Sequence, residues 1–118
     1  MKKAVVHFEI GCGNITQTVD FYREIFDWNI SPTENSASID TGKEGAITGH
    51  INKLGIDEPQ QYITFYIETD TLEIDLKMIE AQGGKKLVNP ITLPDGRTFA
   101  WFEDVAGNKV GLITPSTK

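Results

Sequence analysis

The sequence of 118 residues lacks features that would place it in several protein classes. It contains one cysteine, Cys12, so no disulfide can form within the chain. Structural disulfides belong to oxidising compartments, and we therefore expect a cytoplasmic protein. A basic excess is also lacking, because 11 Lys and Arg residues stand against 17 Asp and Glu residues, a formal net charge of −6. Nucleic-acid binding depends on clustered Lys and Arg, so we expect no nucleic-acid partner.

Long apolar runs are missing too. No stretch approaches the roughly 20 consecutive apolar residues of a membrane-spanning helix, so we expect no membrane partner. The first ten residues hold two lysines but no long apolar segment, unlike a secretory signal peptide. The composition, 39% hydrophobic and 24% charged, is typical of a globular protein. At this length we predict a single domain over residues 1–118.

What is present is a strand followed by a helix. Over residues 5–10, alternate side chains point to opposite faces of a predicted strand. Phe8 lies on the apolar face, and His7 and Glu9 lie on the other. Apolar residues then recur at helical spacing and predict a helix over residues 15–27. The apolar strand face can pack on this helix, which leaves His7 and Glu9 facing either solvent or a cavity.

The same pattern returns 57 residues later. Adding 57 takes Phe8 to Phe65 and Ile15 to Leu72, so the strand core and the helix core match without a gap. The strand that opens the second copy, over residues 61–69, should therefore direct Phe65 toward a helix, as the strand over residues 5–10 directs Phe8. A constant offset over a strand and a helix indicates an internal duplication.

The duplication predicts two βαβββ modules, over residues 1–57 and 58–118. The second helix is expected over residues 71–82, ending at Gly83. The remaining strands are predicted at residues 29–33, 36–40, 46–53, 85–93, 97–104 and 109–114. One module alone would leave the far face of its sheet exposed, and two modules can bring those faces together around a cavity.

Several short segments, in this order, resemble a known family. They are His7-Phe8-Glu9-Ile10, Asp20-Phe21-Tyr22, Phe26-Asp27-Trp28, Glu80-Ala81-Gln82-Gly83-Gly84-Lys85 and residues 102–112, in which Val105 stands where the family usually has proline. With the duplication, they resemble the vicinal oxygen chelate superfamily, also called the glyoxalase/bleomycin-resistance/dioxygenase superfamily. The most similar branch is the glyoxalase-like one related to lactoylglutathione lyase. The resemblance implies an α+β fold in which two βαβββ modules form an eight-stranded, open barrel-like sheet.

The resemblance also implies where a metal would bind in the family's metalloenzymes, with one ligand on the first and one on the last strand of each module. In this sequence the four positions fall on His7, His50, Thr64 and Gly111, with Gly49 as the other register for the second. Threonine is a poor ligand for divalent metals and glycine has no side chain. Only His7 and His50 would remain for a metal, so we expect no metal cofactor.

A ligand-binding pocket is predicted from side-chain parity on the strand faces that turn away from the helices. Its residues are His7, Glu9, Thr48, His50, Thr64, Tyr66, Phe102 and Gly111. Phe102 belongs to the set if the last hairpin is regular and sets it opposite Gly111. His7 and Glu9 are the candidates for acid–base chemistry. The alternative is that His7 only lines the cavity, hydrogen-bonded to Glu9, Tyr66 or His50.

Three hypotheses for function follow. The first is a metal-free, glyoxalase-like protein that binds a small molecule. The second is a lyase, isomerase or dioxygenase of glyoxalase type that acts on a small metabolite. The third is a dimeric domain with a vestigial pocket. A homodimer is expected because each module leaves strand edges and apolar surface.

Overall fold

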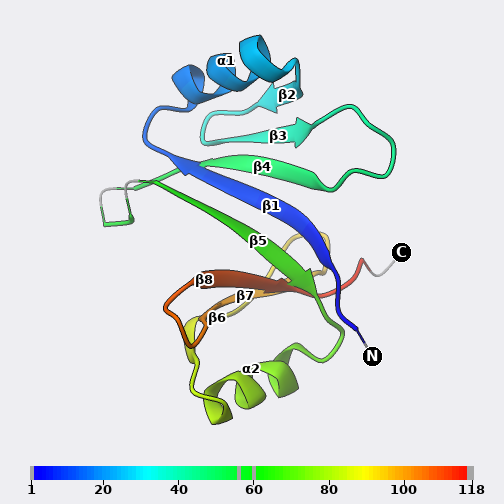
Figure 1. Cartoon of the computed structure of the whole chain (residues 1–118), viewed down its shortest axis with the longest axis vertical. Helices are drawn as coiled ribbons and strands as arrows, with labels where there is room; N and C mark the ends of the chain where they lie inside the picture. The colour runs from blue at the N-terminus through cyan, green and yellow to red at the C-terminus, as the bar shows by residue number, and fades with distance from the viewer. Residues whose placement is uncertain (1, 56, 60, 117–118) are drawn as a thin grey trace. The chain divides into compact units, whose positions relative to one another are not determined.

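The computed structural model of the chain describes residues 2–55, 57–59 and 61–116. The elements in chain order are β1 (Val5–Cys12), α1 (Ile15–Phe26), β2 (Asn29–Pro32), β3 (Ser36–Asp40), β4 (Thr48–Lys53), β5 (Tyr62–Glu68), α2 (Leu72–Ala81), β6 (Lys85–Thr92), β7 (Thr98–Glu103) and β8 (Lys109–Ile113) (Figure 1). This order, βαβββ twice with eight strands, confirms the predicted α+β fold class. No helix of the described residues is long and apolar enough to span a membrane.

The chain divides into two compact units. The first unit is His7–Thr64, and the second combines Met1–Val6 with Phe65–Lys118. The boundary between these units lies inside β5, between Thr64 and Phe65. The strand order is β2-β3-β4-β1 in the first βαβββ half and β5-β8-β7-β6 in the second.

The core of the first unit lies on one face of its strands. Its buried residues are Ile10, Cys12, Val19, Ile30, Ala37, Ile39 and Ile51, and Phe8, Ile15, Tyr22 and Trp28 pack against them. Since Ile10 and Cys12 enter this core, the alternating residues His7 and Glu9 lie on the opposite face of β1. At the start of α1, the Asn14 side chain accepts a hydrogen bond from the backbone N–H of Gln17 at 2.9 Å.

The ends of the helices differ from the prediction by one residue. Asp27 has a left-handed backbone with φ 59°, so α1 ends at Phe26. In the second helix Thr71 and Gln82 are the flanking caps, and α2 itself is Leu72–Ala81. Gly83 follows with φ 99°, a conformation that favours glycine and terminates the helix as predicted.

The parallel pairings confirm that the two halves are equivalent. In the first unit β1 pairs with β4 and sets Glu9 opposite His50. In the second unit β5 pairs with β8 and sets Tyr66 opposite Gly111. Glu9 and Tyr66 are separated by the predicted offset of 57, so His50 and Gly111 occupy matching positions on the last strands.

The predicted position of Phe102, opposite Gly111 on the pocket face, is wrong. The β7–β8 pairing sets Trp101 opposite Gly111 and Phe102 opposite Val110. Phe102 is buried in the second core, whose other buried residues are Leu72, Leu76, Ala100, Val110 and Leu112. The cause is the loop between Glu103 and Lys109, where the Asp104 carboxylate accepts hydrogen bonds from the backbone of Ala106 and Asn108, each at 2.9 Å. This loop has an odd number of residues, and a shift of one residue turns each side chain to the other face.

The apolar face of β5 also departs from the prediction. Phe65, the repeat partner of Phe8, is 41% exposed, and Ile63 is 73% exposed. Only Ile67 of this face packs against the second core. Alternation correctly assigned these residues to one face, but it could not show that α2 leaves most of that face uncovered.

Candidate functional site

A chain of hydrogen-bonded side chains runs across β1, β4 and β5 within the first unit. His7 Nδ1 lies 2.8 Å from Thr48 Oγ1, and His7 Nε2 lies 2.7 Å from His50 Nδ1. His50 Nε2 lies 3.1 Å from Glu9 Oε1. The hydroxyl of Tyr62 donates to the other oxygen of Glu9. These five residues are called the polar chain below.

The strand pairing explains why these residues meet. The parallel register sets His7 opposite Thr48 and Glu9 opposite His50. Side chains two residues apart on a strand share a face, so all four lie on the face of β1 and β4 opposite the core. The structure thus brings together four of the predicted site residues, and the His7–His50 bond is one of the contacts proposed from the sequence.

The carboxylate of Glu9 sets the direction of the hydrogen bonds. A carboxylate only accepts, so His50 donates from Nε2 and its Nδ1 is left to accept. His7 must then donate from Nε2 to His50 and accept at Nδ1, where the Thr48 hydroxyl donates. Each neutral group therefore has a suitable partner, and the order of donation runs from Thr48 through both imidazoles to Glu9.

Glu9 is the most buried member of the polar chain, with 4% of its surface exposed. A buried carboxylate is costly unless donors surround it. His50 and Tyr62 supply one donor to each of its oxygens. Glu9 therefore holds both rings in place, and His50, whose side chain is 30% exposed, extends from it toward solvent.

Tyr62 is a residue that sequence reasoning missed. Burial, together with its hydrogen bond to Glu9, raises the pKa of Tyr62 well above its ordinary value, so the hydroxyl remains a donor. Asn52 Nδ2 lies 3.5 Å from the Tyr62 oxygen. The available signal was Gly11, since a glycine inside a strand often marks a close approach of another group. A Cβ at position 11 would lie 2.5 Å from the Tyr62 ring.

The polar chain does not fit a metal ion as it stands. His50 directs Nδ1 toward His7 and Nε2 toward Glu9, so the three groups do not converge on one point. Among the described residues, no group of three or more His, Cys, Asp or Glu side chains is arranged to hold a metal. In the second unit a Cβ at Gly111 would lie 2.3 Å from the Tyr66 ring, so that ring fills the space of the expected fourth ligand. A metal-free protein stays a prediction.

The other predicted site residues are Thr64, Tyr66, Phe102 and Gly111. Thr64 is buried at the end of the first unit. In the second unit the Tyr66 hydroxyl accepts a hydrogen bond from Trp101 Nε1 at 2.9 Å, and its ring covers Gly111. Phe102 belongs to the second core. Ligand binding by any of these residues stays a prediction.

Known proteins resemble the chain in sequence and in structure. The family described as Glyoxalase/Bleomycin resistance protein/Dioxygenase superfamily matches residues 4–112. A glyoxylase-like domain-containing protein from Didymella fabae is 27% identical over 116 residues, which cover 90% of this chain and 89% of that protein.

Two solved structures share the fold. A methylmalonyl-CoA epimerase in complex with methylmalonyl-CoA and NH4+ has a TM-score of 0.73 at 19% identity, covering 99% of this chain and 97% of that chain. A variant methylmalonyl-CoA epimerase of Streptomyces coelicolor in complex with 2-nitronate-propionyl-CoA has a TM-score of 0.71 at 18% identity, with coverage of 99% and 97%. Because the family match extends over most of the sequence, the chain belongs to the glyoxalase/bleomycin resistance protein/dioxygenase superfamily.

Proposed function

We propose that this protein binds a small molecule at the polar chain, without a resident metal. The observation that carries the proposal is the pair of imidazoles held by the buried carboxylate of Glu9. Binding sites typically offer a few fixed polar groups rather than many mobile ones, and here the hydrogen bonds fix both rings. The structurally similar epimerases are described in complex with acyl-CoA compounds, which supports small-molecule binding by this fold.

The ligand meets the polar chain at His7 Nδ1. The present partner of that atom is the Thr48 hydroxyl. This hydrogen bond is solvent-exposed and forms one end of the polar chain. A threonine hydroxyl can rotate away, so a ligand O–H or N–H can take its place. A protonated His7 would instead donate from Nδ1 to a ligand oxygen.

The histidine count makes this proposal testable by NMR. The sequence has two histidines, His7 and His50, so both imidazole signals report on the site. A library of acyl-CoA thioesters, glutathione adducts and small aromatic metabolites should contain a compound that shifts both signals. Its binding should weaken in His7→Gln and persist in Thr48→Val. A compound that binds equally well to His7→Gln would show that the site lies elsewhere.

The lack of a resident metal needs a measurement of its own. Elemental analysis of untagged protein should find less than a stoichiometric amount of zinc, nickel, cobalt, manganese or iron. Ligand binding should also be unchanged after treatment with a chelator. One equivalent of metal that is lost in His7→Gln would overturn this part of the proposal.

A second candidate is an enzyme that moves a proton, as an isomerase or a lyase. The observation that favours it is the single direction of donation toward Glu9. If His7 Nδ1 takes a proton from a substrate C–H, the imidazolium that forms is stabilised through His50 by the negative charge of Glu9. The dioxygenase alternative is weaker, because a metal-dependent dioxygenase needs ligands that converge on one ion, and these donors do not.

Proton transfer can be detected as exchange with solvent. The protein is incubated in D2O with methylmalonyl-CoA, chosen because it has an acidic C–H between two carbonyl groups, and deuterium uptake is followed by mass spectrometry. Chelator is added in one arm and divalent metals in another. Uptake that needs His7 and Glu9 but no metal supports the enzyme. NMR-detected binding without uptake supports the binding protein.

We also propose that the protein is a cytoplasmic homodimer. Its single cysteine is buried, which suits a reducing compartment. Phe21, Ile25 and Phe26 of α1 are each more than half exposed and offer an apolar surface to a second copy. Sedimentation equilibrium at micromolar concentration should give a mass near 26 kDa, about twice the chain mass of 13.1 kDa. A mass of one chain would contradict the dimer.

A further inference from the structure

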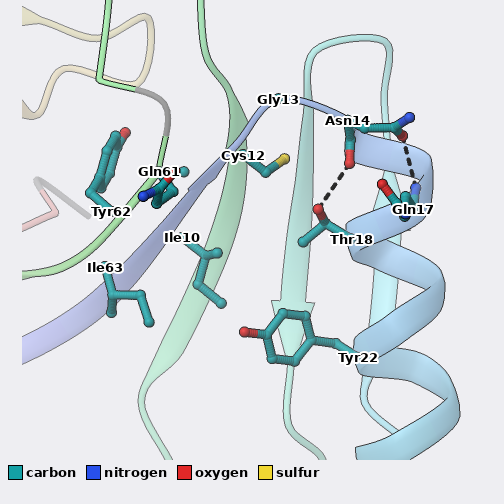
Figure 2. A pocket seen from close by; sticks show the side chains of 11 residues that line it. Ile10, Cys12, Gly13, Asn14, Gln17, Thr18, Tyr22, Gln61, Tyr62 and Ile63 are labelled. Atoms are coloured by element: carbon teal, nitrogen blue, oxygen red, sulfur yellow. Dashed lines mark hydrogen bonds between the residues drawn. The ribbon is translucent and has the colours of Figure 1, made fainter.

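A second feature of the first unit is a cavity on the helix side of β1. Its volume is about 610 Å³ (Figure 2). Its lining residues are Ile10, Gly11, Cys12, Gly13, Asn14, Gln17, Thr18, Tyr22, Gln61, Tyr62 and Ile63. Figure 2 shows Tyr22 reaching in from α1, with Ile10 on β1 and Ile63 and Tyr62 on β5 across from it. The volume is within the roughly 300–1,000 Å³ range of small-molecule sites.

None of the described residues in the lining has a charged side chain. The lining consists of apolar side chains, two phenol rings, a thiol, a hydroxyl and amides, although 24% of the whole sequence is charged. An ionised ligand would find no counter-charge here and would lose its hydration. The lining therefore selects for an uncharged molecule.

Some polar groups of the lining are available to such a molecule. Asn14 and Thr18 are committed to the start of α1, where the Thr18 hydroxyl donates to the Asn14 carbonyl at 2.8 Å. The Tyr22 hydroxyl and the side-chain amides of Gln17 and Gln61 make no hydrogen bond with any described residue. They can donate to or accept from a ligand without breaking an internal contact.

Ile63 adds exposed apolar surface to the lining. It is 73% exposed although it lies on the same face of β5 as core-packed Ile67. A ligand between Ile63 and the Tyr22 ring would cover this surface, and burial of apolar area is the usual source of binding energy. A ring-bearing ligand suits this lining, because it can pack against the Tyr22 ring and the Ile63 side chain.

We infer that this cavity binds an uncharged, ring-bearing molecule with one or two hydrogen-bonding groups. The site is distinct from His7, because the alternating residues Ile10 and Cys12 line it on the opposite face of β1. The two sites share Tyr62, whose ring lines the cavity and whose hydroxyl donates to Glu9. The inference does not depend on the proposed function of the polar chain.

The test uses prodan, an uncharged naphthalene dye with a carbonyl group whose emission shifts to the blue in an apolar site. Titration of the wild-type protein should show one saturable site. The variant Ile63→Glu places a charge at an exposed position of the wall and should weaken binding by at least about tenfold, because the ligand must then lie against an ionised group. Its fold is checked by circular dichroism.

Two controls separate this cavity from other surfaces. The variant Ile74→Glu makes the same change at an exposed residue of α2 outside the lining and should leave the affinity unchanged. The variant His7→Gln should also leave it unchanged. With isoleucine methyl labels, prodan should shift the signals of Ile10 and Ile63 but not that of Ile74.

Three results would overturn the inference. They are no saturable binding by the wild-type protein, equal affinity in Ile63→Glu and wild type, and equal weakening in Ile74→Glu and Ile63→Glu. Loss of prodan binding in His7→Gln would instead place the dye at the polar chain and would also overturn it. A failure of the proposed function would appear separately, in the histidine signals.

Discussion

Replacement of Tyr62 by phenylalanine tests whether Glu9 is the anchor of the site. The variant keeps the ring over Gly11 but removes the hydroxyl that donates to Glu9. Glu9 is almost fully buried, and the oxygen that faces Tyr62 would lose this donor while the other oxygen keeps His50. A hydrogen bond to a charged group contributes about 1.5–3 kcal/mol, so Tyr62→Phe should lower the free energy of unfolding by about 2 kcal/mol at pH 7.

The pH dependence gives a sharper check. The folded pKa of Tyr62 is raised, first by burial and then by the bond to Glu9, whereas the unfolded value is about 10. The contribution of the hydroxyl is therefore complete below pH 10 and declines above it, because only the unfolded state ionises there. The stability difference between wild type and Tyr62→Phe should shrink by about 1.4 kcal/mol per pH unit above pH 10.

Urea unfolding at pH 7 and between pH 10 and 11 measures both effects. Tyr22→Phe is the matched control, because the Tyr22 hydroxyl makes no hydrogen bond with any described residue. It should cost less than about 0.5 kcal/mol, as expected for a substitution that removes no buried contact. A difference for Tyr62→Phe as small as that of the control, or one that grows above pH 10, would refute the role assigned to Glu9.

Three further outcomes are expected. Gly11→Ala would place its Cβ 2.5 Å from the Tyr62 ring, and displacing that ring should lower the free energy of unfolding by about 1–3 kcal/mol in urea titrations. Burial acts to raise the pKa of Asp75. Hydrogen bonds to its carboxylate, above all from Thr69 and Lys3, outweigh this effect and hold the pKa below its ordinary value. Asp75→Asn should therefore be about 1 kcal/mol less stable at pH 7, with the difference lost as pH falls through the folded pKa. His50→Gln should remove the shift of the remaining histidine signal on ligand binding, since His50 links His7 to Glu9.

The sequence was sufficient for the fold because the duplication sets many positions at once. The offset of 57 matched the first strand and the helix of each half, and a short insertion then matched His50 with Gly111 on the last strands. Parity placed His7 and Glu9 on one face. The failures have local causes. The odd-numbered loop held by Asp104 moved Phe102 into the core. Periodicity assigns faces, but loop length and the reach of a covering helix depend on contacts that no pattern encodes.

Tyr62 was missed because its function depends on a side chain far from it in sequence. Glu9 lies 53 residues earlier and meets the Tyr62 hydroxyl only once β5 is placed. Nothing in the local sequence distinguishes a tyrosine whose hydroxyl donates to a carboxylate from one that only packs. The absence of a side chain at Gly11 was the one available clue.

The two halves of the duplication have kept the same backbone but not the same chemistry. Where the first unit pairs Glu9 with His50, the second pairs Tyr66 with Gly111, and the Tyr66 ring lies over the glycine. Its hydroxyl accepts from Trp101, so the position serves packing and a hydrogen bond rather than a titratable pair. At these matching positions the first unit therefore contributes a carboxylate and an imidazole, and the second contributes a phenol beside a glycine. A site that drew equally on both halves would need a polar side chain at position 111, and the aromatic ring already fills the space into which it would extend.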